Sequence, residues 1–202
     1  MQPSNIKILR RIDHHGRGFA FTPKDFLDLA SRGAIDMSLS ALAADGVIRR
    51  IARGLYDYPR SSPALGGQLS PDTDQVAQAI ARRFRWRIIP EGPLAANLLG
   101  LSTQVPARIV YLSDGPTRKI QIGKQVLYFK HAQPKETRTE GTVASLVIQA
   151  LRYLGKDAVD DGMVQRLREK LSPTERRRLL REARYSAGWI YETARRIARE
   201  EP

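Results

Sequence analysis

The stretch from Ile35 to Tyr58, IDMSLSALAADGVIRRIARGLYDY, restricts the possible folds of this chain more than any other. Apolar side chains recur at helical spacing over residues 35–42, and Gly46 stands where glycine commonly follows a helix. Residues 47–51 and 55–58 are rich in β-branched and aromatic side chains, which favour strands. The stretch therefore predicts a helix followed by a two-stranded ribbon with arginines at its bend.

The residues before this stretch predict two more helices. Ser4-Asn5 can cap the first, and Thr22-Pro23 has the N-cap and first-position residues of the second. Gly33 then ends the second helix, and the third helix begins near Ala34. Three short helices and a hairpin follow the order of a winged helix-turn-helix, a DNA-binding fold. A helix and hairpin packed in another small domain is the alternative.

The remaining residues predict a second domain behind a linker. Residues 59–71, PRSSPALGGQLSP, are rich in proline, glycine and serine, as linkers are. Residues 72–202 then form the second domain, with a small sheet over 85–131, in which three strand-like runs suggest a meander, and helices over 139–202. The chain is therefore predicted to be α+β, with an N-terminal winged helix-turn-helix over residues 1–58 and a small mixed α/β domain with a helical C-terminal part.

The charge of the chain favours an anionic partner. Lysine and arginine total 34 against 21 aspartate and glutamate, a net charge of +13, and basic proteins attract polyanions such as nucleic acid. There is no cysteine, which excludes disulfides and thiolate zinc sites. The charged N-terminus and the lack of a long apolar run predict a cytoplasmic protein with no membrane partner.

Enzymatic motifs are missing from the sequence. Its three histidines, His14, His15 and His131, do not stand at ligand spacing with carboxylates. Neither a G-x-x-x-x-G-K-[ST] phosphate loop nor a G-x-S-x-G nucleophile elbow occurs. We therefore expect no catalytic residue, no metal and no cofactor.

Two segments carry a resemblance to a known family. They are LSALAADGVIRRIARGLYDYP and IPEGPLAANLLGLSTQVPARIVYLSDGPTRKIQIG, and the second contains a distinctive G-x-x-A-A-x-x-L-G-L run followed by T-x-x-P. With these segments the chain resembles the AbiEi-type antitoxins of type IV toxin–antitoxin (abortive infection) systems, over roughly residues 4–135. The C-terminal helices match only loosely.

The resemblance implies a function. It implies a repressor that binds inverted repeats of double-stranded DNA in its own promoter, as a possible dimer on DNA. It also implies a nucleotidyltransferase-like toxin as partner, counteracted directly or functionally. A stand-alone winged-helix transcriptional regulator and a protein-binding adaptor with a vestigial winged helix are the alternatives.

The third helix carries few side chains suited to reading DNA. With Ile35, Leu39 and Leu42 inward, its outward face includes Asp36, Met37, Ser40, Ala41 and Ala44. Ser40 can donate to a base or phosphate, Met37 can touch a thymine methyl, and Asp36 would repel phosphate. Family members often have an arginine near positions 37 and 41, so this neutral face departs from the family.

Arginines of the ribbon and its surroundings supply the charge that the helix lacks. Arg53 at the turn is placed to enter a minor groove, with Arg49 and Arg50 beside it. Arg17, Lys24 and Arg32 can hold backbone phosphates, although Arg32 also fits a helix cap, and either Arg49 or Arg50 can pack along the sheet. We expect the ribbon to provide most of the DNA affinity, so that replacing its three arginines flattens the salt dependence of binding.

Two other basic segments fit either function or structure. Arg177, Arg181 and Arg184 share one helical face, which is a second DNA or toxin contact or a solvated face partly neutralised by Glu175 and Glu182. Residues 83–87, RFRWR, interleave basic and aromatic residues, as in a half-buried strand or a nucleic-acid-binding strand.

Overall fold

Helices and short strands are mixed along the whole chain in the computed structural model, which describes residues 3–104, 106–123, 125–133 and 142–199. The predicted α+β class is thereby confirmed. Contacts divide the chain into two compact units, residues 1–86 with 121–125, and residues 87–120 with 126–202. The end residues 139–141 and 200–202 of the predicted helical part lie outside the described residues.

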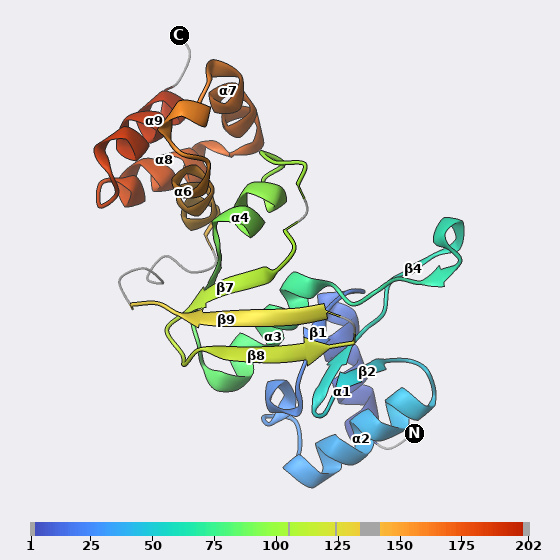
Figure 1. Ribbon diagram of the computed structural model, residues 1–202. Helices are drawn as coiled ribbons and strands as arrows, with labels where there is room; N and C mark the ends of the chain where they lie inside the picture. Colours follow the sequence, from blue (N-terminus) through green and yellow to red (C-terminus); the bar gives the residue numbers. More distant parts are fainter. Residues whose placement is uncertain (1–2, 105, 124, 134–141, 200–202) are drawn as a thin grey trace. The chain divides into compact units, whose positions relative to one another are not determined.

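The first unit begins with helices and a small antiparallel sheet (Figure 1). Strand β3 is central, between β1 and β2. The elements are α1 (Pro3–His15), β1 (Ala20–Phe21), the 3₁₀ helix η1 (Pro23–Phe26), α2 (Arg32–Ala44), β2 (Arg49–Ala52) and β3 (Leu55–Asp57). Strands β2 and β3 are joined by the turn Arg53-Gly54, where Gly54 has a φ of +67° that favours glycine. The predicted ribbon is therefore present.

The core of this unit is formed by α1, η1, α2 and the sheet. Its fully buried side chains include Ile8, Ile12, Phe21, Phe26, Ile35 and Leu39. The second predicted helix is only a 3₁₀ turn over Pro23–Phe26, and Leu27, expected on its apolar side, is 50% exposed. Helix α2 begins at Arg32, earlier than predicted, since Ser31 is its N-cap and accepts a hydrogen bond from the Ala34 amide.

Residues 59–71 do not lead away into another unit. They form a small hairpin of β4 (Ser61–Ser62), η2 (Pro63–Leu65) and β5 (Gly67–Gln68), closed where the Leu69 amide donates to the Arg60 carbonyl at 2.8 Å. The next helix, α3 (Thr73–Phe84), then packs back on β1, β3 and η1. The boundary between the two units thus lies after Trp86, whereas the sequence pattern predicted it at residues 59–71.

The strands that follow form one four-stranded sheet in the order β6-β7-β9-β8. They are β6 (Ile88–Pro90), β7 (Ile109–Ser113), β8 (Arg118–Ile122) and β9 (Gln125–His131). Strand β9 lies between β7 and β8 and runs parallel to β7, and β8 runs opposite to β9 in Figure 1. The predicted meander was therefore wrong, because β9 inserts between the two strands that precede it. The predicted strand at residues 85–90 begins only at Ile88.

The second unit is completed by a cluster of helices with its own apolar core. The helices are α4 (Gly92–Leu98), α6 (Val143–Leu154), the 3₁₀ helix η3 (Lys156–Ala158), α7 (Asp161–Lys170), α8 (Pro173–Ala183) and α9 (Gly188–Ala198). Helices α4 and α6 approach closely, because Ala95 and Ala96 are small and buried and a Cβ at Gly92 would lie 2.4 Å from the Cβ of Tyr153. The G-x-x-A-A run is therefore a helix-packing motif.

Candidate nucleic-acid interface

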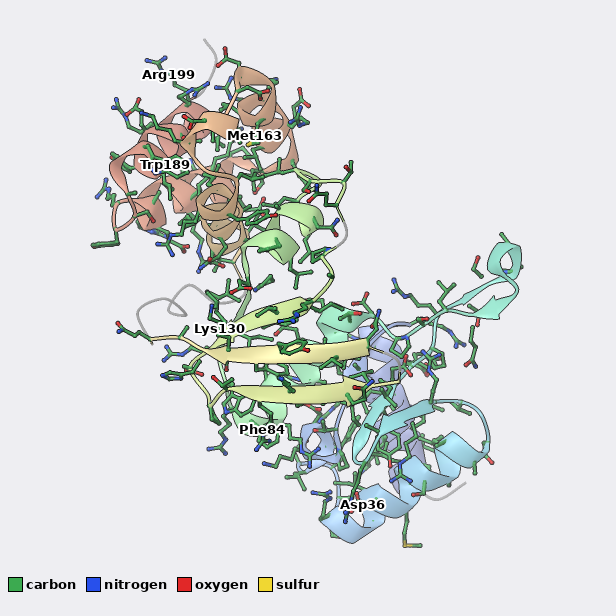
Figure 2. The ribbon with its side chains drawn as sticks, in the orientation of Figure 1. Asp36, Phe84, Lys130, Met163, Trp189 and Arg199 are labelled. Atoms are coloured by element: carbon green, nitrogen blue, oxygen red, sulfur yellow. The ribbon has the colours of Figure 1, made fainter. Side chains whose placement is uncertain are left out.

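The exposed face of α2 is close to neutral. Met37 is 66% exposed, and Ser40 is exposed beside it. Because α2 begins at Arg32, this face gains a cation that the sequence pattern had located before the helix. The Arg32 Nε, however, donates to Asp36 Oδ2 at 2.9 Å, one helical turn along (Figure 2 labels Asp36). The pair leaves the face with no net charge.

Arg49 has a structural role inside the hairpin. Its Nε and Nη2 donate to the two oxygens of the Asp57 carboxylate at 3.0 and 2.6 Å, and its Nη1 donates to the Leu69 carbonyl at 2.9 Å. Asp57 is 1% exposed, so this carboxylate needs the guanidinium that neutralises it. Arg49, one of the residues expected to contact DNA, therefore holds β2 to β3 and to the base of the β4–β5 hairpin.

Arg50 and Arg53 differ from Arg49 in being exposed. The side chains of both make no hydrogen bond or ion pair within the described residues. Arg50 lies opposite Tyr56, just before an irregularity in the β2–β3 register, and Arg53 occupies the turn. The hairpin therefore presents two unpaired guanidinium groups on a scaffold that Arg49 and Asp57 fix.

Arg17 and Lys24 are exposed but each contacts the protein. The Arg17 guanidinium lies 4.3 Å from the Tyr58 ring centroid and donates to the Pro59 carbonyl at 3.0 Å. The Lys24 ammonium donates to the Arg83 carbonyl at 2.9 Å. Both can still meet a phosphate, since an ammonium has three donors and a guanidinium has five.

Helix α3 adds basic residues that the sequence pattern did not assign to this surface. Arg82 holds the helix in place by donating to Asp25 Oδ1 at 3.0 Å and to the Ala20 carbonyl at 2.7 Å. Arg83 Nη1 lies 3.4 Å from the carbonyl of Arg53 at the hairpin turn. The available signal was the run of arginines in RFRWR, which is the end of α3 and a turn and not the expected strand.

The second basic face is exposed on α8. Arg177, Arg181 and Arg184 make no ion pair within the described part of the chain. The two carboxylates expected to neutralise it have other partners. Glu175 accepts hydrogen bonds from the Ser172 hydroxyl and amide, which lower the pKa of Glu175, and Glu182 accepts one from Arg178 at 2.7 Å.

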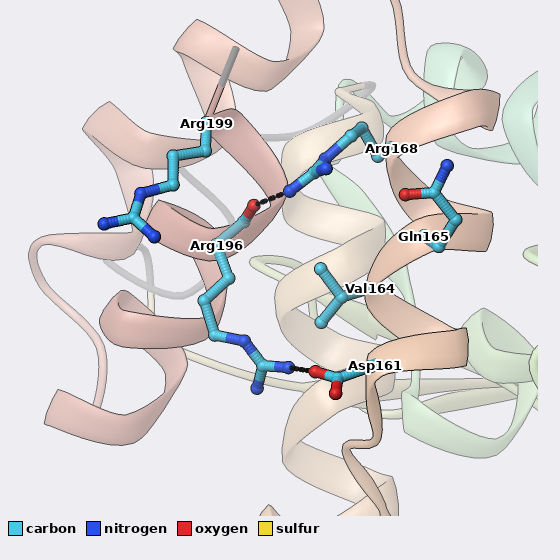
Figure 3. Close-up of a pocket in the computed structure, with 6 residues that line it drawn as sticks. All are labelled: Asp161, Val164, Gln165, Arg168, Arg196 and Arg199. Atoms are coloured by element: carbon cyan, nitrogen blue, oxygen red, sulfur yellow. Dashed lines mark hydrogen bonds and ion pairs between the residues drawn. The ribbon is translucent and has the colours of Figure 1, made fainter. Parts of the chain in front are cut away.

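A hollow of about 220 Å³ between α7 and α9 also contains arginines (Figure 3). Arg196 pairs with Asp161, and Arg168 donates to the Arg196 carbonyl at 2.6 Å. Both contacts hold α9 against α7, and the carbonyls at the C-terminal end of α9 give this end a negative partial charge. Arg168 and Arg196 of this hollow are therefore explained by helix packing.

Metal-binding clusters and membrane-spanning helices are both absent from the described residues. No group of three or more histidine, aspartate or glutamate side chains is arranged to hold a metal ion there. Within the same residues, no helix has the length and apolar character needed to cross a membrane.

A protein family model matches the sequence over most of its length. A family of unknown function (DUF6088) matches residues 7–179. No curated protein matches the chain.

Proposed function

The chain belongs to the family of unknown function DUF6088, and we propose that it is a DNA-binding antitoxin that represses its own operon. In this proposal α1, η1, α2 and the β2–β3 hairpin act as a winged helix-turn-helix. The order of these elements and their single shared core support that assignment. The hairpin then corresponds to the wing, and α2 to the recognition helix.

The observation that carries the proposal is the difference in pairing among the three hairpin arginines. Arg49 is tied to the buried Asp57, while Arg50 and Arg53 project without partners among the described residues. A rigid hairpin with two free guanidinium groups is suited to phosphates or to a narrow minor groove. The neutral face of α2 leaves a smaller part of the affinity to base readout through Met37 and Ser40.

A binding experiment tests the DNA-binding part. The full chain is titrated into a fluorescent duplex carrying the region upstream of its own gene, and into a shuffled duplex of equal length. We expect tighter binding to the upstream duplex and a linear loss of log affinity with log salt. Equal binding to both duplexes would contradict the proposed role as a repressor. A lack of binding to either duplex would contradict DNA binding altogether.

The antitoxin part rests on the resemblance to AbiEi-type antitoxins. If a nucleotidyltransferase-like reading frame adjoins the gene, its expression alone should arrest growth, and co-expression of this chain should restore it. Growth arrest that persists despite co-expression overturns the antitoxin part and leaves a stand-alone regulator.

One observation favours a protein-binding adaptor as a second candidate. The Arg32–Asp36 pair makes the exposed face of α2 neutral, and Met37 on it is 66% exposed, which suits a protein surface. An adaptor should bind neither duplex at physiological salt beyond the weak attraction of any basic protein. The duplex titration therefore separates the two candidates.

A further inference from the structure

Arg85 adopts a backbone conformation that favours glycine. It ends α3 with φ 58° and ψ 37°, and among the described residues it is the only non-glycine residue with positive φ. The turn needs this conformation, because the Arg85 amide donates back to the carbonyls of Ala81 and Arg82 and the Trp86 amide donates to Ala81. Glycine adopts it without steric penalty and arginine does not.

No contact of the Arg85 side chain within the described residues offsets this backbone strain. It is exposed and makes no hydrogen bond or ion pair within the described residues. Its neighbours are engaged: Arg82 with Asp25, and Arg83 with the Phe84 ring at 5.4 Å and with the Arg53 carbonyl. A charge placed on a strained backbone with no internal partner is available for an external one.

Hydrogen bonds join the end of α3 to the turn of the hairpin. Lys24 donates to the Arg83 carbonyl at 2.9 Å, and Arg83 reaches the Arg53 carbonyl at 3.4 Å. Arg85 follows Phe84, the last residue of α3, which Figure 2 labels. Lys24, Arg53 and Arg83 are therefore gathered where η1, the hairpin turn and α3 meet, and Arg85 follows at the end of α3.

Little negative charge opposes this cluster. Asp25 is paired with Arg82, Asp57 with Arg49, and Asp72 with Arg60. The ion pairs leave the guanidinium groups of Arg53 and Arg85 uncompensated. Because a DNA strand carries one phosphate for each 3.4 Å of helix axis, neighbouring cations on one surface can each meet a phosphate.

We propose that the C-terminal end of α3 is a second DNA-backbone contact, with Arg85 as its principal phosphate-binding residue. The proposal rests on the proposed DNA-binding function and extends it beyond the winged helix-turn-helix. Because phosphates carry no sequence information directly, this contact adds affinity and fixes orientation without discriminating between sequences.

The test compares Arg85→Gly and Arg85→Lys with the wild-type chain. Affinities for the upstream and shuffled duplexes are measured across a salt series, together with the Tm of each variant. Arg85→Gly should bind both duplexes about tenfold more weakly at low salt, with a salt slope smaller by about 1. Its Tm should equal or exceed that of the wild type, because glycine relieves the strained backbone. Arg85→Lys keeps the charge and should bind nearly as well as the wild type.

The alternative role of Arg85 is to stabilise the C-terminal end of α3 through the helix dipole. That role predicts a lower Tm and unchanged affinity for Arg85→Gly, which would overturn the proposal. An Arg85→Lys variant that binds as weakly as Arg85→Gly would also overturn it. If the wild type binds the duplexes and Arg85→Gly binds them equally well, only this inference fails, whereas a wild type that binds neither duplex overturns the proposed function as well.

Discussion

Asp57 on β3 binds Arg49 on β2 through two hydrogen bonds, from Nε to Oδ1 at 3.0 Å and from Nη2 to Oδ2 at 2.6 Å. The carboxylate is buried, and the guanidinium is partly exposed. It separates three arginines that look equivalent in the sequence into one that stabilises the hairpin and two that face solvent.

Replacing Arg49 should therefore affect stability. In Arg49→Ala the buried Asp57 carboxylate loses its partner, and the free energy of unfolding should fall by about 3 kcal/mol. Arg50→Ala, the matched control on the same strand, should change it by less than about 0.5 kcal/mol. Urea denaturation of both variants measures the difference, and equal stabilities would contradict the structural role of Arg49.

Gly92 should not tolerate a methyl group. In Gly92→Ala the new Cβ would lie 2.4 Å from the Cβ of Tyr153, so α4 and α6 must separate, at a cost of about 1–3 kcal/mol. Gly188 also occupies the first position of a helix, but a Cβ added there would have no neighbouring atom within 4 Å. Gly188→Ala should stabilise the protein by about 0.5 kcal/mol. Thermal unfolding gives the Tm of each variant. Similar Tm values for the two variants would show that the packing of α4 against α6 does not need the glycine.

Much of the fold follows from local sequence signals. The third helix with its buried Ile35, Leu39 and Leu42 and the ribbon with its Arg53-Gly54 turn are present, because periodicity and turn chemistry are properties of neighbouring residues. Two features were not predictable in this way. The packing of α3 in the first unit involves contacts between distant residues, such as Arg82 with Asp25, and the insertion of β9 between β7 and β8 depends on strand pairing between distant residues.

The exposed face of α2 should accept a cation with a gain in affinity. Ser40→Arg adds a guanidinium to a neutral face, and we expect about tenfold tighter binding at low salt with a salt slope larger by about 1. Ala158→Arg adds the same charge at an exposed position of the second unit. If both variants gain equally, the effect reflects net charge, and α2 does not face DNA.

Tyr58 should give the fold a measurable pH dependence above neutrality. A hydrogen bond to Asp13 and burial raise the pKa of Tyr58, while the nearby Arg17 lowers it. Because the folded-state pKa is raised, the contribution to stability is fully present below the unfolded value of about 10 and is lost as the pH rises through the folded pKa. Urea unfolding from pH 9 to 11 should show a steeper decline for the wild type than for Tyr58→Phe. Parallel declines would mean that Tyr58 titrates alike in both states.

The candidate interface was only partly predictable for a related reason. Exposure of Met37, Ser40, Arg50 and Arg53 follows from helix and strand periodicity. The engagement of Arg49 by Asp57 and of Lys24 by the Arg83 carbonyl requires tertiary structure. The same holds for Arg85. The sequence pattern predicts the start of a strand at this residue, but in the structure its left-handed backbone ends α3.

We propose that Arg50 and Arg53 supply two of the phosphate contacts that make DNA binding depend on salt. The measurement is the slope of log affinity against log salt for the duplex upstream of the gene, with the wild type and with the double variant Arg50→Ala, Arg53→Ala. We predict a slope smaller by about 2 in the double variant, one unit for each lost phosphate contact, with a free energy of unfolding within about 0.5 kcal/mol of the wild type. An unchanged slope in the folded double variant would show that Arg50 and Arg53 do not contact DNA phosphates.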